Sequence, residues 1–253
     1  VPIAFITGRS DAFVREQIVG PLLEEGIAES LRRHDVMFGV FEKGATWAPI
    51  TENGLGEVEV DPTVALPEDV VAELRALTER RFPATMFWDD TKRAMVSVEQ
   101  RTDVAAEAYK RDQPRFDAAA FDILVGAGVG VRHEDRESPD AAGRIPFRID
   151  STIISTDVES VLLDKDRGAE RALAYFAERM ELPTRWRSIG DSRSDYKMAD
   201  ALHAAGFEVA HVDVRPSDGV LEKPYPVITI DDRIHDAAGA AFLAHWTREL
   251  DLS

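Results

Sequence analysis

Short apolar runs alternate with amphipathic stretches along much of this chain. Val1 to Thr7 and Val36 to Phe41 are nearly continuous apolar runs, which predict buried strands of a parallel sheet, and Ala12 to Glu25 between them predicts a helix. The pattern returns later, with strands expected at Ile149 to Thr156, Pro183 to Ile189, Glu208 to Val212 and Val227 to Ile230, and helices at Ala169 to Met180 and Ala237 to Glu249. This alternation predicts an α/β fold with a doubly wound, Rossmann-like parallel sheet.

The pattern differs between about Trp47 and residue 148. Short strands are expected at Met86 to Trp88 and Ala94 to Val98, a helix at Pro67 to Phe82, and a less regular helical region at Asp103 to Leu124, interrupted at Pro114. These elements predict an α+β module inserted into the parallel sheet. We therefore expect three segments: a first core part at 1–46, an inserted domain at 47–148, and a second core part at 149–253.

Composition narrows the class of protein. The 253 residues are 44% hydrophobic, contain no cysteine and carry a formal net charge of −17. No apolar run reaches the roughly 18 residues of a membrane-spanning helix, and without cysteine there are no disulfides, so we expect a soluble, cytoplasmic protein. The acidic charge argues against nucleic acid and anionic membranes as partners. Arginine strongly outnumbers lysine, and the acids outnumber the two together, which is typical of a high-GC genome or of a salt-adapted cytoplasm; a salt-adapted source is a further hypothesis.

The candidate metal site is the stretch Arg187 to Met198. Gly190 permits a sharp exit from the expected strand, and Asp191 and Asp195 follow it four residues apart, so both carboxylates face the same edge of the sheet. Ligands bind at this edge in α/β sheets, and one or two carboxylates suit Mg2+. The alternative is an ordinary helix cap followed by a solvated aspartate.

Two further positions predict phosphate binding. Thr7 ends the first strand and is followed by Gly8 and Arg9, so its hydroxyl can donate to a phosphate oxygen at the sheet edge; it can equally satisfy its own turn. Lys165 opens a helix in a chain with six lysines, where a positive charge could offset a phosphoryl group. The alternative for Lys165 is an ordinary surface lysine.

The order of these signals resembles the haloacid dehalogenase superfamily of phosphohydrolases. More narrowly, a strand ending in Thr-Gly-Arg, an exit at Glu42 to Ala45, an α+β insertion, a helix-opening lysine and Gly-Asp-Ser-x-Ser-Asp is similar to the Cof-type and sucrose-phosphate phosphatase branch with a large inserted cap. The resemblance implies that Thr7 binds the transferring phosphoryl group together with Gly8 and Arg9. It implies the motif lysine at Lys165 and Mg2+ ligands at Asp191 and Asp195.

The chain departs from this family in three places. Ser194 stands where many relatives have asparagine, and Asp166-Arg167-Gly168 follows Lys165 where many have glycine directly, so Arg167 is a rival for the lysine's role. The family's nucleophilic Asp-x-Asp motif, which would end a strand before Thr7, is missing. We expect it on an N-terminal segment upstream of Val1, of on the order of 30 to 40 residues by ordinary element lengths. The alternative is a protein that lost its nucleophile and only binds a ligand.

The resemblance implies a Mg2+-dependent phosphomonoester hydrolase that acts through an aspartyl-phosphate on a small phosphorylated metabolite, such as a sugar phosphate or a phosphoglycolate-like compound. A ligand-binding or regulatory protein of the same fold, or a phosphosugar mutase, is the alternative. We further expect Asp191 and Asp195 to face Thr7 and Lys165 across one strand edge. The sequence carries no signal for an oligomeric state.

Overall fold

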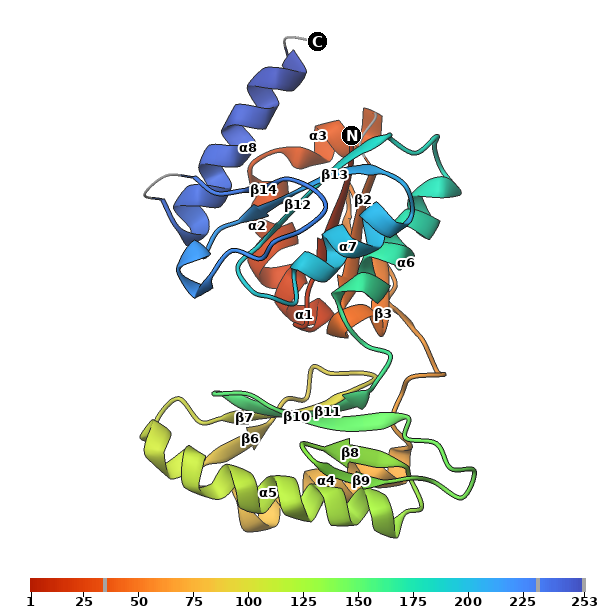
Figure 1. Cartoon of the computed structure of the whole chain (residues 1–253), viewed down its shortest axis with the longest axis vertical. Coiled ribbons are helices and arrows are strands. Elements are labelled where there is room, and N and C mark those ends of the chain that lie inside the picture. The colour runs from red at the N-terminus through yellow and green to blue at the C-terminus, as the bar shows by residue number, and fades with distance from the viewer. Residues whose placement is uncertain (34–35, 231–232, 252–253) are drawn as a thin grey trace. The chain divides into compact units, whose positions relative to one another are not determined.

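The computed structural model describes residues 1–33, 36–230 and 233–251 (Figure 1). By its contacts the chain divides into two compact units. Residues 5–163, with Val1 and Ile3, make up the N-terminal unit, and residues 164–253, with Pro2 and Ala4, make up the C-terminal unit. The N-terminal unit holds a five-stranded and a six-stranded sheet, and the C-terminal unit holds a three-stranded sheet. The strands expected in one sheet therefore belong to separate sheets in the two units.

The five-stranded sheet begins with the first expected strand. Its order is β1-β2-β3-β4, with β5 also on β3, and its strands are β1 (Pro2–Ile6), β2 (Val36–Phe41), β3 (Thr46–Thr51), β4 (Gly54–Leu55) and β5 (Glu59–Val60). The strands at 2–6 and 36–41 confirm the predictions. The prediction that the first strand is fully buried was wrong, because Ile3 is 38% exposed and Phe5 is only partly buried against the core.

The helical run after β1 is continuous but irregular. It passes from α1 (Asp11–Val14) through a π-helical turn, η1 (Arg15–Val19), into α2 (Gly20–Glu24), and α3 (Ile27–Arg33) follows. Pro21 lacks the N–H that would extend the α-helical ladder, and Gly20 N–H instead reaches back to the Arg15 carbonyl. Val14 and Val19 pack on Met37 and Phe41 of β2. The run thus covers this sheet as the sequence predicts.

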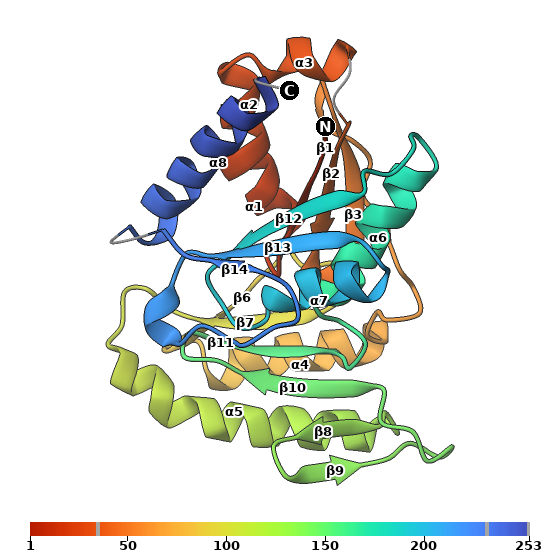
Figure 2. The same ribbon diagram turned by 45° about the horizontal axis from the view of Figure 1, so that its top comes forward.

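The six-stranded sheet carries two helices on one face (Figure 2). Its order is β6-β7-β11-β10-β8-β9, with β6 (Met86–Trp88), β7 (Val96–Gln100), β11 (Ser155–Ser160), β10 (Phe147–Ser151), β8 (Val131–His133) and β9 (Arg136–Ser138). Helices α4 (Glu68–Arg81) and α5 (Ala106–Gly126) pack against its apolar side chains. Because side chains alternate along each strand, the opposite face carries the polar residues.

Helix α5 runs without a break through Pro114, so the expected interruption was wrong. Pro114 is exposed, and so is Lys110, whose carbonyl loses its usual N–H partner at position 114. The buried stripe of the helix, which includes Tyr109, Phe116 and Leu124, stays on the core side. Because the proline lies on the solvent-exposed face, the helix keeps its contacts with the core.

The segment after residue 146 differs from the single strand that was expected. Residues 147–151 and 155–160 form the antiparallel hairpin β10–β11, with Ile149 opposite Val158. This hairpin joins the six-stranded sheet through β7 and β8, so the boundary expected at residue 148 falls inside β10 and the compact unit ends at Leu163. The turn at Thr152 makes the hairpin possible, since Thr152 Oγ1 accepts hydrogen bonds from the amides of Ile154 and Ser155. The division into a core and an inserted cap stays a prediction.

The C-terminal unit is a parallel sheet with helices on both faces. Its order is β12-β13-β14, with β12 (Arg185–Gly190), β13 (Glu208–Asp213) and β14 (Val227–Ile228). One face packs against α6 (Lys165–Ala177) and α7 (Tyr196–Ala204), and the other against α8 (His235–Asp251). Val209 and Val212 of β13 point to opposite cores. The expected doubly wound α/β class is thus confirmed.

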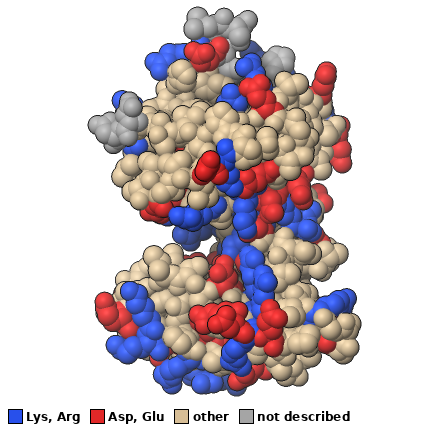
Figure 3. Space-filling view, viewed as in Figure 1, with Lys and Arg blue, Asp and Glu red and all other residues tan. Residues whose placement is uncertain are grey.

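The helices and the charged surface bear on the expectations from composition. None of the helices in the described part of the chain combines the length and the apolarity needed to cross a bilayer. On the face shown in Figure 3, basic side chains lie among acidic ones. The expectation that nucleic acid is not a partner stays a prediction.

The core beneath the six-stranded sheet yields a stability prediction. Phe116 is fully buried, with its ring edge-on to Phe82 at 5.6 Å. Phe116→Ala should lower the free energy of unfolding by about 3–5 kcal/mol, because it removes buried area and leaves a cavity. Phe87→Ala, at a side chain that is 40% exposed, should cost under about 1 kcal/mol. Urea unfolding measures both, and equal losses would contradict this packing.

Candidate active site

The loop that follows β12 folds around the carboxylate of Asp195. Its Oδ2 accepts hydrogen bonds from Asp191 N at 3.1 Å, Ser192 N at 3.0 Å and Ser192 Oγ at 2.8 Å. Gly190 makes this approach possible, because a Cβ at that position would lie 2.1 Å from Asp195 Cβ. The glycine expected at the strand exit is therefore required by the second aspartate.

Lys165 completes the surroundings of Asp195. It is the first residue of α6, and its Nζ contacts Asp195 Oδ1 in a short ion pair. Burial alone would raise the pKa of Asp195, but the Lys165 charge and the Ser192 hydrogen bonds hold it below its ordinary value. Asp195 is thus an ionised, buried carboxylate with both oxygens bonded.

Asp191 is the open carboxylate of the site. Its side chain is 52% exposed, and its nearest cation is Arg215 Nη1 at 3.5 Å from Oδ2. Mg2+ commonly takes one or two protein carboxylates and fills the remaining positions with water and phosphate oxygens, and Asp191 fits that requirement. Among the described residues, no group of three or more His, Asp or Glu side chains is arranged to hold a metal. Both oxygens of Asp195 are bonded to Lys165 and the loop, so Asp191 is the more accessible candidate ligand, and the role of Asp195 as a second Mg2+ ligand stays a prediction.

The N-terminus of α6 distinguishes the two candidates for the motif lysine. Asp164 caps the helix by accepting from Lys165 N at 2.8 Å and also contacts Lys197 Nζ of α7. These contacts hold the start of α6 against α7, so that Lys165 Nζ reaches Asp195. This geometry favours Lys165 over Arg167 for the role implied by the family resemblance.

The turn Thr7-Gly8-Arg9 lies at the end of β1 in the N-terminal unit. Thr7 Oγ1 accepts a hydrogen bond from Arg9 N at 3.0 Å, which is the local turn contact considered as the alternative. The hydroxyl proton of Thr7 and the Gly8 amide have no acceptor among the described residues. Thr7 can therefore satisfy its turn as an acceptor and still donate to a phosphate oxygen.

Two lysines beside this turn were not singled out from the sequence. Lys92 Nζ donates to the Gly8 carbonyl at 2.7 Å, with its side chain only 6% exposed. Lys43 packs its side-chain carbons against Gly8, at 3.6 Å from the position that a Cβ would take there. Both lie far from Thr7 in sequence, and no motif marks them; only the short list of six lysines hinted at them.

Arg215 was also missed, although a structural rule could have found it. It follows the end of β13, which pairs with β12 in parallel so that Gly190 lies opposite Asp213. Residues just after neighbouring parallel strands meet at one sheet edge, which brings Arg215 to Asp191. Thr7, Gly8 and Arg9 belong to the other compact unit, so the expected meeting of the two groups stays a prediction.

Comparisons with known proteins support the fold. No protein-family model and no curated protein matches the chain. Among solved structures, a haloacid dehalogenase-like hydrolase from Bacteroides thetaiotaomicron matches with a TM-score of 0.52 and 12% identity, over 97% of this chain and 86% of that one. A trehalose-6-phosphate phosphatase from Aspergillus fumigatus matches with a TM-score of 0.46, 17% identity and coverages of 97% and 78%. The sucrose-phosphatase of Synechocystis matches with a TM-score of 0.44, 13% identity and 98% coverage of both chains.

The first of these similarities shows the fold. The chain has the haloacid dehalogenase-like fold, so the resemblance read from its motifs is confirmed for the fold. At such low identity the similarity establishes architecture, and the activity is argued from the site.

Gly190 provides a test of the loop geometry. Gly190→Ala should destabilise the protein by about 1–3 kcal/mol, because the new methyl group collides with Asp195 and must displace it. Gly239→Ala in α8 is the matched control: no atom lies within 4 Å of its Cβ position, and it should stabilise the helix by up to about 1 kcal/mol. Urea unfolding of both variants checks the difference, and equal stabilities would refute the geometry.

The ion pair of Asp195 predicts a pH dependence. Its folded pKa lies below the ordinary value of about 3.9, so the ionised pair stabilises the protein above that pH and the stabilisation is lost as the pH falls through the folded pKa. Asp195→Asn should therefore be less stable than the unsubstituted protein at pH 7, and the gap should narrow below about pH 4. Unfolding free energies measured across this range would argue against the pair if the gap stayed constant.

Proposed function

We propose that the protein is a Mg2+-dependent phosphomonoester hydrolase acting on a small phosphorylated metabolite. The observation that carries this proposal is the site at the end of β12, where Asp191 is open and Asp195 is held ionised by Lys165. A carboxylate for a divalent cation and a fixed ammonium beside it are what phosphoryl transfer requires, since that chemistry depends on positioning and charge neutralisation. The haloacid dehalogenase-like fold supports the same activity.

In this proposal each residue has a distinct task. Asp191 would hold Mg2+, whose charge offsets that of the phosphoryl oxygens. Asp195 keeps Lys165 oriented and charged, and Lys165 would bind a phosphoryl oxygen. Thr7 would bind a phosphoryl oxygen through a hydrogen bond from its hydroxyl, with Gly8 and Arg9 completing the turn.

The nucleophile implied by the family resemblance is an aspartate that forms an aspartyl-phosphate. We propose that it comes from outside Val1 to Ser253, so assays need the protein expressed from its complete coding sequence. A reading frame that stops just upstream of Val1 without an Asp-x-Asp motif would favour a protein that binds phosphate esters without hydrolysing them.

A panel of phosphorylated metabolites, assayed for phosphate release with and without Mg2+, tests the activity. We expect release that depends on Mg2+ and is abolished by a chelator. Ester binding in isothermal titration without release would indicate a binding protein, and phosphoryl transfer between positions of one sugar would indicate a mutase.

Asp191→Asn tests the metal role directly. It should lower Mg2+-dependent turnover by about 100-fold or more, because the amide no longer offers the cation a charged oxygen. Isothermal titration with Mg2+ should show weaker binding for the same variant. Asp236→Asn, at an exposed carboxylate of α8, is the matched control and should leave both unchanged. Unchanged turnover in Asp191→Asn would remove Asp191 from the metal site.

A further inference from the structure

Lys43 occupies a short segment whose backbone is clamped from two sides. Glu42 and Lys43, in the 3-10 turn η2 (Glu42–Gly44), have positive φ angles of 49° and 56°, a conformation that side chains disfavour. Glu42 N donates to the Arg9 carbonyl at 3.1 Å, and Lys43 N donates to the Thr7 carbonyl at 3.0 Å. The turn that carries Thr7 is therefore bonded directly to this segment.

The side chain of Glu42 fixes the segment from the other side. It is fully buried, and its carboxylate accepts from the amides of Arg93 at 2.9 Å, Ala94 at 3.0 Å and Met95 at 3.1 Å. Three amide donors to one buried carboxylate make a strongly directional contact. Because these bonds hold residues 42–43 in the left-handed region, the direction in which the Lys43 side chain leaves the backbone is set.

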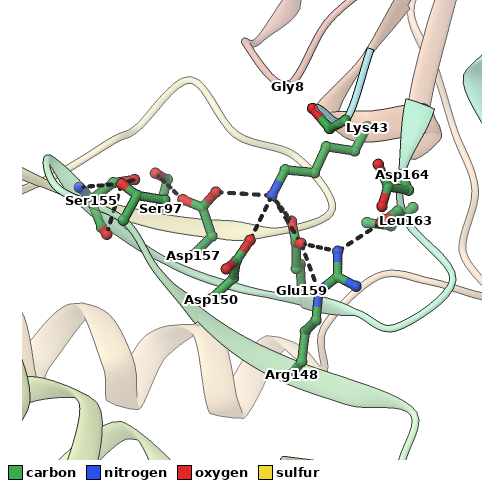
Figure 4. A network of polar contacts seen from close by, with 12 residues as sticks. Gly8, Lys43, Ser97, Arg148, Asp150, Ser155, Asp157, Glu159, Leu163 and Asp164 are labelled. Carbon is green, nitrogen blue, oxygen red and sulfur yellow. Dashed lines mark hydrogen bonds and ion pairs between the residues drawn. The ribbon is translucent and has the colours of Figure 1, made fainter. Parts of the chain in front are cut away.

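The Lys43 side chain runs along Gly8 and ends on the six-stranded sheet (Figure 4). Its ammonium lies 2.8 Å from Glu159 Oε2, 3.3 Å from Asp157 Oδ2 and 3.4 Å from Asp150 Oδ2. The Lys43 side chain is 19% exposed and Glu159 is fully buried. Burial alone would lower the pKa of Lys43, but the three carboxylates raise it above its ordinary value, so the ammonium stays charged.

The three carboxylates stand on the polar face of the sheet, opposite α4 and α5. Asp150 of β10 and Asp157 of β11 are register partners, and Arg148 Nη2 bonds Glu159 Oε1 at 2.7 Å. Together with Lys43 these five side chains sum to one negative charge. The same face approaches the Thr7 turn again where Arg9 Nη1 lies 3.7 Å from Glu99 of β7. A phosphoryl group at Thr7 would thus have this face beside its leaving group.

We propose that Lys43 is a positioning residue that fixes the Thr7-Gly8 turn against the polar face of the six-stranded sheet, so that the phosphoryl group and a hydroxyl-rich leaving group are held in one register. This inference rests on the proposed function for its catalytic consequence. Asp150 on this face, with a side chain that is 47% exposed, can accept a hydrogen bond from a hydroxyl group, and the surplus negative charge of the face disfavours a leaving group that carries a carboxylate of its own. The face that Lys43 holds beside the Thr7 turn thereby favours sugar phosphates over phosphoglycolate-like esters.

Hydrogen exchange tests the tie independently of activity. Lys43→Met keeps the aliphatic side chain but removes the charge, and the amides of residues 7–11 and 42–43 should exchange about tenfold faster, because the clamped turn opens more often. Lys43→Arg should exchange at nearly the rate of the unsubstituted protein. Lys110→Met, at an exposed lysine of α5, is the matched control and should show no change. Equal exchange in Lys43→Met and Lys110→Met would overturn the proposal.

Kinetics separates positioning from a merely structural role. On the complete protein, Lys43→Met should lower kcat/KM for glucose 6-phosphate by at least about tenfold and for p-nitrophenyl phosphate by less than about threefold, since only the sugar needs the register with the face. Lys43→Arg should restore most of the difference. Equal losses on both esters would refute positioning. An unsubstituted protein that releases no phosphate from any ester would overturn the proposed function, while the exchange result would still decide the tie.

Lys43→Met leaves buried carboxylates with less compensation and could fail to fold. The double variant Lys43→Met/Glu159→Gln removes the charge of the fully buried carboxylate and supplies a foldable background. It should show the same fast exchange at residues 7–11 and the same loss of selectivity for the sugar ester. Recovery of both properties in the double variant would show that charge imbalance, and not the lost tie, caused the effects.

Discussion

A carboxylate removed from water must be paired with cations or hydrogen-bond donors. In the C-terminal unit, the loop after β12 and the start of α6 are arranged around one buried carboxylate, that of Asp195. Asp195 is 5% exposed, so the loop after β12 turns its own amides toward it and α6 presents Lys165 to it. Gly190 follows from the same requirement, since any side chain there would occupy the space of the carboxylate. The amides of the loop are bonded to Asp195 and not to Asp191, so the Asp191 carboxylate faces solvent.

The N-terminal unit contains two buried carboxylates that are compensated in the same way. Glu42 is fully buried and accepts hydrogen bonds from three backbone amides. Glu159 is fully buried and forms ion pairs with Lys43 and Arg148. Removing one partner from such a cluster leaves an uncompensated charge, which is why these contacts define one arrangement of the turn and the sheet. In each unit, therefore, a buried acid orients a lysine, Lys165 in one and Lys43 in the other.

Element types were largely predictable because apolar periodicity reflects one-sided burial. The strand at 36–41 and the helix at 68–81 confirm this. The wrong predictions concern segments where tertiary contacts or solvent exposure outweighed a local sequence preference. Pro114 does not interrupt α5 because it lies on the exposed side of the helix, where water can replace the missing N–H, and the segment at 147–160 is a hairpin because β7 and β8 offer it two edges to pair with.

The α/β class and the residue types of the candidate site could be predicted from the chain alone, because strand ends, glycine exits and acid spacing are local features. Asp191, Asp195 and Lys165 could be named from that information alone. Three pairings emerge only in the folded protein: Lys165 binds Asp195, Asp191 stays open beside Arg215, and Lys43 reaches three carboxylates more than 100 positions away. Such pairings depend on which buried charges come into contact in the fold, and no spacing along the chain encodes that.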